Sequence, residues 1–374
     1  MASEDEELDI RRQQIRAAIE RVWATDAGDR QPTGGFRVPP APGAIVGEAS
    51  RALEPASPGA AVRAGTYRTS TGEALTAAEL ARRYRTRELS PVEVTREALG
   101  RAEAEQARLN AFITLTPELA LDAARAAEAR FARGEPLGPL DGVPIGVKDI
   151  IEVAGVRNTA ASKILAGNVA AANAPVIERL TAGGAVIIGK TNLHEFAYGG
   201  TGDRGCFGPA RNPWNPEHMT GGSSSGSAAA VAAGICPIAL GTDTAGSVRI
   251  PAALCGIVGL KPTYGRVSTQ QVIPLSWNMD HVGPMTGTVE DAALALSAMC
   301  PFEPPSFSEQ LSNVKVGICR PHFWEHLDVE VRRLAELAIS RFGEAVEVEL
   351  PSIGLGAAAQ AVITAAEAGA YHRR

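Results

Sequence analysis

Two short segments, both rich in hydroxyl groups and small residues, contain the side chains of this sequence that are best suited to chemistry. Residues 221–227 read GGSSSGS, and residues 241–249 read GTDTAGSVR. Small residues let the backbone approach a substrate closely. In the second segment, consecutive backbone N–H groups can point at one spot and hold an oxyanion, with Ser247 as an exposed hydroxyl at the end of the turn. The pattern is typical of a hydrolase with a serine nucleophile.

A serine nucleophile needs a partner that accepts its proton, and Lys148 is a candidate. It lies in the apolar, strand-like run of residues 140–151 (LDGVPIGVKDII), and lysines are rarely buried without a reason. A surface lysine, or an ion pair with Asp149, explains the residue equally well. If Lys148 is buried, loss of hydration lowers its pKa and leaves a neutral amine that acts as a base. Lowering that pKa from about 10.4 to about 7 costs about 4–5 kcal/mol.

The first segment taken alone is open to other interpretations. It formally matches the G-x-S-x-G nucleophile elbow, with Ser224 as the nucleophile. Such an elbow follows directly on a strand, and the two prolines within residues 211–216 disfavour a strand there. The segment also lacks the Gly-Lys-Ser/Thr ending of a phosphate-binding loop. A plain flexible Gly/Ser turn is the remaining alternative.

The elements around these segments predict an α/β sheet, because helical patterns alternate with apolar strands. A helical pattern starts at residues 75–80, and Ser90 is predicted to cap a second helix, with Pro91 at the first position and Glu93 closing a capping box. Further predictions are a helix over 176–182, strands over 185–189, 235–240, 315–319 and 344–348, and a helix over 329–342. The last helical pattern runs to the final residue without a stop signal, which suggests a fragment or a shortened relative of a longer protein.

Composition narrows the class of protein. The chain has 374 residues, 45% of them apolar and 21% charged, and no uninterrupted run of 18 apolar residues that would span a membrane. A formal charge of −6 argues against a nucleic-acid groove. The five cysteines are widely spaced and odd in number, so we expect reduced thiols rather than disulfides or a zinc site. The acidic amino terminus is unlike a targeting signal, and a cytoplasmic location is expected.

Three regions are predicted along the chain. Residues 1–30 form an amphipathic helix, with Leu8, Ile15, Ile19 and Val22 on one face, and residues 31–70 form a linker rich in Pro, Gly and Ala. Residues 71–374 form the main domain. The helix docks on that domain, or it joins a second copy or a partner subunit, and the sequence does not choose between these.

Seven ordered segments together resemble the amidase signature family, over most of the chain from Leu75 onward. They are residues 142–149, 189–196, 208–214, 221–234, 241–256, 259–265 and 280–285. The resemblance implies an α/β fold with a large mixed sheet flanked by helices. Family members usually continue well past the position of Arg374, so the domain over 71–374 is expected to be incomplete at its carboxyl end.

The resemblance also implies a Ser-Ser-Lys triad. Ser247 falls on the acyl-forming serine, Ser223 on a bridging serine whose peptide bond is often cis, and Lys148 on the base. The N–H groups of Thr244, Ala245, Gly246 and Ser247 are implied as the oxyanion hole. Asp243 and Arg249 are expected to stabilise this turn, and His194 and His281 to pack around the site. No metal or organic cofactor is implied.

This sequence departs from the common family pattern at Ser225 and Ala245, where glycine is frequent; both residues are small, so the chemistry should survive. The main functional prediction is hydrolysis of a small-molecule amide, because residues 365–372 (AAEAGAYH) resemble the Glu-Ala-x-x-x-His run of stand-alone amidases. One alternative is the A subunit of a glutamine-dependent tRNA amidotransferase, and another is an inactive fragment or binding protein that retains the motif. Direct contact with nucleic acid or a membrane is not expected.

Overall fold

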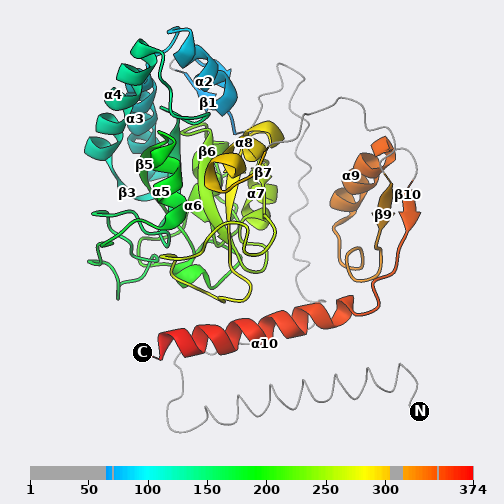
Figure 1. Cartoon of the computed structure of the whole chain (residues 1–374). Coiled ribbons are helices and arrows are strands. Elements are labelled where there is room, and N and C mark those ends of the chain that lie inside the picture. Colours follow the sequence, from blue (N-terminus) through cyan, green and yellow to red (C-terminus); the bar gives the residue numbers. More distant parts are fainter. Residues whose placement is uncertain (1–64, 70, 304–314, 343–344, 374) are drawn as a thin grey trace, which may run out of the picture. The chain divides into compact units, whose positions relative to one another are not determined.

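A computed structural model of the chain describes residues 65–69, 71–303, 315–342 and 345–373 (Figure 1). The predicted amino-terminal helix over 1–30 and nearly all of the predicted linker over 31–70 lie outside these residues. The chain divides into two compact units, a larger one over 60–307 and 367–374 and a smaller one that includes 308–366. The predicted single domain over 71–374 stays a prediction.

A six-stranded mixed sheet forms the centre of the larger unit, which confirms the predicted fold class. Its strand order is β3-β5-β4-β6-β8-β7. The strands are β3 (Phe112–Leu115), β4 (Pro144–Lys148), β5 (Val186–Thr191), β6 (Ile238–Asp243), β7 (Val258–Gly259) and β8 (His281–Thr286). Strand β4 pairs in parallel with both β5 and β6, and the other pairs are antiparallel. Every residue of β4, β5 and β6 is buried, as expected for central strands covered on both faces.

Helices surround this sheet, with α3 and α4 packed together on the side of β3 and β5 (Figure 1). The helices are α2 (Ala77–Arg85), α3 (Pro91–Leu109), α4 (Pro117–Arg133), α5 (Pro175–Ala182), α6 (Ser225–Ala232), α7 (Arg249–Cys255) and α8 (Val289–Met299), with a 3-10 turn at Glu195–Ala197. A short hairpin of β1 (Tyr67–Arg68) and β2 (Ala74–Leu75) precedes them. Helix α6 connects the serine-rich segment to the central strand β6. It is almost wholly buried, and its residues are small and mostly apolar.

Helix caps confirm one prediction and correct another. The Ser90 hydroxyl accepts hydrogen bonds from Val92 N and Glu93 N, and Pro91 opens α3 as expected. The capping box, however, lies at Thr76 and Glu79 of α2, where each side chain accepts from the other's backbone N–H. The prediction that Glu93 closes a box was wrong, since only the Ser90 half of the pattern forms.

Strand β6 (Ile238–Asp243) begins and ends three residues later than the sequence indicated, because residues 235–237 are not part of it. The apolar run predicted a strand over 235–240, whereas the ladder with β8 continues through Thr242 and Asp243. The second chemistry-bearing segment therefore begins inside the sheet. Only residues 244–248 form the turn before α7, so Thr242 is a rigid strand residue.

In the smaller unit, β9 (Val316–Ile318) pairs in parallel with β10 (Ala345–Glu347), and α9 (Val329–Ile339) starts at an Asp328 N-cap and continues into a 3-10 turn at Ser340–Phe342. These match the predicted elements. Helix α10 (Ile353–His372) is long and apolar enough to cross a membrane by length and composition, although scattered polar residues interrupt its apolar run. This is weak evidence for a span, and Glu367 and Ala368 of α10 are buried within the larger unit.

Candidate active site

Lys148, the last residue of β4, is fully buried. Its Nζ lies 2.7 Å from Ser223 Oγ and 2.7 Å from Thr242 Oγ1. Burial lowers the pKa of Lys148 from 10.5 to about 7, against the opposing influence of Asp280 and Asp243. The ion pair with Asp149 that the sequence allowed does not form, since the described salt bridge of Asp149 is with Lys190. Lys148 is thus a lysine surrounded by hydroxyl groups, poised between amine and ammonium at neutral pH.

Ser223 lies in the serine-rich segment, directly after a cis peptide bond from Gly222. The side chain is fully buried. Backbone hydrogen bonds fix the segment on both sides, because Gly222 N donates to Gly200 O at 2.8 Å and His194 N donates to Ser223 O at 3.0 Å. Ser223 is therefore held rigidly with its hydroxyl on the Lys148 amine.

Ser247 ends the turn between β6 and α7, beside the serine-rich segment. The two segments are joined by hydrogen bonds from Ser224 N to Ser247 O at 3.3 Å and from Ser224 Oγ to Thr242 O at 3.2 Å. Ser247 is only 8% exposed, less than the open turn predicted from sequence. Among the hydrogen bonds of the described residues, none joins the Ser223 and Ser247 hydroxyls.

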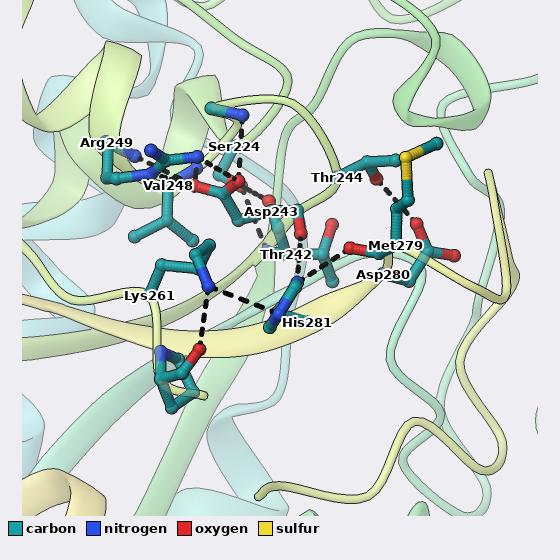
Figure 2. A network of polar contacts seen from close by, with 12 residues as sticks. Ser224, Thr242, Asp243, Thr244, Val248, Arg249, Lys261, Met279, Asp280 and His281 are labelled. Carbon is teal, nitrogen blue, oxygen red and sulfur yellow. Dashed lines mark hydrogen bonds and ion pairs between the residues drawn. The ribbon is translucent and has the colours of Figure 1, made fainter. Parts of the chain in front are cut away.

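Asp243 organises the turn that contains Ser247 (Figure 2). Its carboxylate accepts from Gly246 N at 2.8 Å and Val248 N at 3.2 Å, and it pairs with both Nε and Nη2 of Arg249 at 2.9 Å. Burial raises the pKa of Asp243, but the Arg249 guanidinium and the backbone N–H donors outweigh it, so the net shift is downward. The stabilising role predicted for Asp243 and Arg249 is confirmed by these contacts.

The same contacts limit the predicted oxyanion hole. The Gly246 N–H is engaged by Asp243, so in this conformation it is not free for a substrate oxygen. The N–H groups of Thr244, Ala245 and Ser247 have no acceptor among the described residues. A glycine is needed at position 246 for the shape of the turn, because its φ of +120° lies in a region that side-chain-bearing residues rarely adopt.

A second carboxylate, Asp280, lies on the other side of the turn (Figure 2). It accepts from Thr244 Oγ1 at 2.5 Å and from the N–H groups of Leu275 and Ser276. Burial raises the pKa of Asp280, although Thr244 and the backbone donors oppose the shift. In the sequence, Asp280 stands out only as the first residue of the motif over 280–285. A carboxylate 36 residues away in sequence carries no local signal that it will hold Thr244.

The histidines and Ser224 have structural partners. His194 Nδ1 accepts from Gly202 N at 3.3 Å, and His281 Nδ1 contacts Met279 O at 2.6 Å, as expected for packing groups. The Ser224 hydroxyl is fully buried and bonded to the Thr242 backbone, which is incompatible with an exposed nucleophile elbow. All five cysteines are free, as predicted. Within the described part of the chain, no three His, Cys, Asp or Glu side chains group as metal ligands.

Lys190 is a second fully buried lysine, which the sequence analysis did not single out. It lies on β5, the neighbour of β4, and its Nζ is 3.2 Å from Asp149 Oδ1 and 2.7 Å from Asn158 Oδ1. Burial lowers the pKa of Lys190 and raises that of Asp149, and each residue opposes the shift of the other. The sequence signal for its burial is the apolar run directly before it in β5.

The sequence profile of the Amidase family matches residues 93–374, so the chain belongs to this family and the resemblance to amidase signature proteins is confirmed. The A-type subunit of glutamyl-tRNA(Gln) amidotransferase from Geobacter metallireducens is 44% identical over 312 residues, covering 79% of this chain and 64% of the relative. A solved structure described as part of a vestigial protein complex that reveals the origins of an s-triazine catabolic enzyme has a TM-score of 0.76 at 38% identity, covering 80% of this chain and 68% of its own. The peptide amidase of Stenotrophomonas maltophilia has a TM-score of 0.71 at 34% identity, with coverage of 80% and 67%.

Two further points follow from these comparisons. The chain spans less than two thirds of the length of the curated relatives it matches. Those relatives are amidotransferase A subunits, so they favour the alternative function named from the sequence over the small-molecule amidase that residues 365–372 suggested.

Proposed function

We propose that this protein cleaves a carboxamide C–N bond through an acyl-enzyme on Ser247, with Lys148 as the base and Ser223 as the proton relay. The observation that carries the proposal is the fully buried Lys148, with a pKa of about 7, in hydrogen-bond contact with Ser223. A neutral amine at this position has a lone pair for the Ser223 proton and still donates to Thr242.

In the proposed mechanism, a proton moves from Ser247 through Ser223 to Lys148. As Ser247 Oγ attacks the amide carbonyl, its proton passes to Ser223 Oγ while the Ser223 proton passes to Lys148 Nζ. The developing oxyanion is held by the N–H groups of Thr244, Ala245 and Ser247, since Gly246 donates to Asp243. The C–N bond then breaks, and the proton returns by the same path to the leaving ammonia or amine. Water then attacks the ester of Ser247 and passes a proton through Ser223 to Lys148. The proton returns to Ser247 Oγ as the ester C–O bond breaks and the carboxylic acid leaves.

For the substrate, we propose the terminal amide of glutamine, because the curated relatives are glutamyl-tRNA(Gln) amidotransferase A subunits. The name of these relatives implies partner subunits, and such a partner is proposed for this chain as well. A small-molecule or peptide amide is the second candidate. It is favoured by the run from Glu367 to His372 and by the TM-score of 0.71 with the peptide amidase, against 0.63 with the amidotransferase A subunit of Thermotoga maritima.

Labelling with a fluorophosphonate tests the chemistry without a known substrate. Attack by Ser247 forms an O–P bond and expels fluoride, and peptide mass spectrometry locates the adduct. We expect the adduct on Ser247 in the wild-type chain, none in Ser247→Ala, and strongly slowed labelling in Ser223→Ala. A folded wild-type chain that stays unlabelled would support the alternative of an inactive fragment.

The substrate proposals are separated by ammonia release. Glutamine and a panel of simple and peptide amides are compared with the chain alone and with the partner subunits of an amidotransferase. Release from glutamine that depends on the partners supports the amidotransferase function. Turnover of other amides by the chain alone, without glutamine release, would replace it with the amidase.

A further inference from the structure

A chain of hydrogen bonds connects Glu367, on α10, to the turn that contains Ser247. Glu367 belongs to the larger unit and is 8% exposed. Its carboxylate accepts from Ser276 Oγ at 2.6 Å, from Asn278 N at 3.2 Å and from Asn278 Nδ2. The loop over 275–280 is thus attached to this carboxylate at two residues.

Ser276 is hydrogen-bonded to both Glu367 and Asp280 and so links the two carboxylates. While its hydroxyl donates to Glu367, its backbone N–H donates to Asp280 Oδ2 at 3.0 Å. Leu275 N donates to the same oxygen at 2.9 Å, and Asp280 N donates back to Ser276 O at 2.7 Å. Ser276 is fully buried, so each of these polar groups depends on its protein partner.

Asp280 then holds the turn itself. Its Oδ1 accepts from Thr244 Oγ1, and Thr244 is the first residue of the turn whose N–H groups the proposed mechanism uses (Figure 2). On the opposite side, Asp243 and Arg249 fix the end of the turn. Thr244 has no hydrogen bond besides the one to Asp280 among the described residues. The position of this first residue therefore depends on the loop that Glu367 anchors.

We propose that Glu367 is a positioning residue, which sets the N–H groups of residues 244–247 through Ser276, Asp280 and Thr244. This inference rests on the proposed function, because it assigns a role in oxyanion binding. This role explains the glutamate of the Glu-Ala-x-x-x-His run by its contacts with the loop over 275–280, whichever amide is the substrate. Glu367 does not touch the reacting atoms.

The test compares Glu367→Ala and Glu367→Gln with Asp291→Asn in the full chain. Asp291 is the control, since it is a second buried carboxylate of the larger unit that accepts backbone N–H groups, here those of Ala77 and Ala78 at the start of α2. The fluorophosphonate labelling rate constant is normalised to the fraction of chain that finally labels, which removes the effect of partial unfolding. We expect about a tenfold fall for the alanine variant, because three donors lose their acceptor. Glutamine, which keeps one acceptor oxygen, should fall in between, and Asp291→Asn should stay within about twofold of the wild type.

Hydrogen exchange gives a second measurement that needs no activity. In Glu367→Ala, the hydrogen-bonded amides of Gly246, Leu275 and Ser276 should exchange faster than in Asp291→Asn, with residues 186–191 of β5 unchanged as an internal reference. Equal exchange in the two variants, or a normal labelling rate in Glu367→Ala, would overturn the inference. If the wild type itself is not labelled, the proposed function fails, and the exchange experiment still decides whether Glu367 positions the turn.

Discussion

Two lysines on adjacent strands, Lys148 and Lys190, are both fully buried and have different surroundings. Lys148 is bonded to two hydroxyls, and burial brings its pKa to about 7. Lys190 has a carboxylate counter-ion in Asp149 and an amide oxygen in Asn158. Burial lowers the pKa of both lysines, and at Lys190 the paired Asp149 carboxylate opposes the shift directly. At Lys148 the opposing carboxylates, Asp280 and Asp243, act only from a distance.

The two lysines also differ in the kind of group that they contact. Asp149 accepts from Thr159 N at 2.9 Å as well as pairing with Lys190, so this ion pair holds the loop after β4 onto β5. Lys148 is bonded to groups that can exchange protons with it. The first arrangement holds a loop in place, and the second is the one that the proposed proton relay requires.

The largest expected effect is the difference in labelling rate between Lys148→Met and Lys190→Met. Lys148→Met removes the base, and we expect fluorophosphonate labelling of Ser247 to slow by about 10³-fold. Lys190→Met retains the relay, and labelling per folded molecule should change by less than about tenfold, because the contact it removes is indirect. Rate constants measured at pH 8 on samples of known folded fraction decide this. Similar losses in both variants would show that Lys148 has no special role.

The free energy of unfolding should fall more in Lys190→Met than in Lys148→Met, the opposite of the order expected for the labelling rates. Lys190→Met leaves the buried Asp149 carboxylate unpaired and should lower the free energy of unfolding by about 3–5 kcal/mol. The double variant with Asp149→Asn should recover part of that loss. Urea unfolding measures both, and an unchanged midpoint for Lys190→Met would mean that the ion pair is not buried in solution.

Lys148→Met should not destabilise below pH 7. Keeping the ammonium buried, with its pKa lowered from 10.5 to about 7, costs the wild type about 5 kcal/mol there. Between pH 7 and about 10.5 only the unfolded chain binds that proton, so wild-type stability should rise with pH and the advantage of the methionine variant should shrink. Urea midpoints at pH 6 and pH 9 test this sign.

The labelling rate should itself report the state of Lys148. With a pKa of about 7, the neutral fraction falls about tenfold per pH unit below pH 7 and levels off above pH 8. The same acid limb should persist in Lys190→Met. A rate that decreases from pH 6 to pH 9 would rule out a neutral lysine base.

Thr242→Val should have the smallest effect. The valine keeps the branched shape on β6 but removes the second acceptor of Lys148, which disfavours the ammonium and lowers the pKa of Lys148 further. We expect the acid limb of the rate profile to move to lower pH, with a change of less than about tenfold at pH 8. Thr242→Ser serves as the control, because it restores the hydroxyl, and its profile should match the wild type.

Much of this architecture was predictable because its signals are local. Gly183 and Gly184 end α5, Ser90 caps α3, and the apolar run before Lys148 forms β4, since each depends on neighbouring residues only. The capping box at Thr76 and the extension of β6 through Asp243 were missed. The capping box has a short local pattern, Thr76 followed three residues later by Glu79, and was predictable in principle. The end of β6 depends on pairing with β8, more than thirty residues away, which no local pattern indicates.

For the candidate site, the sequence by itself predicted the residues to which the proposed mechanism assigns chemistry, because hydroxyls, an apolar-flanked lysine and small turn residues are visible in the order of the chain. It could not determine their partners. Only the tertiary structure decided that Asp149 pairs with Lys190 and not with Lys148, that Asp243 takes the N–H of Gly246, and that Ser247 is nearly buried. The physical reason is that the pKa of a group and the freedom of an N–H depend on what surrounds them in space, and those neighbours come from strands and loops far apart in the sequence.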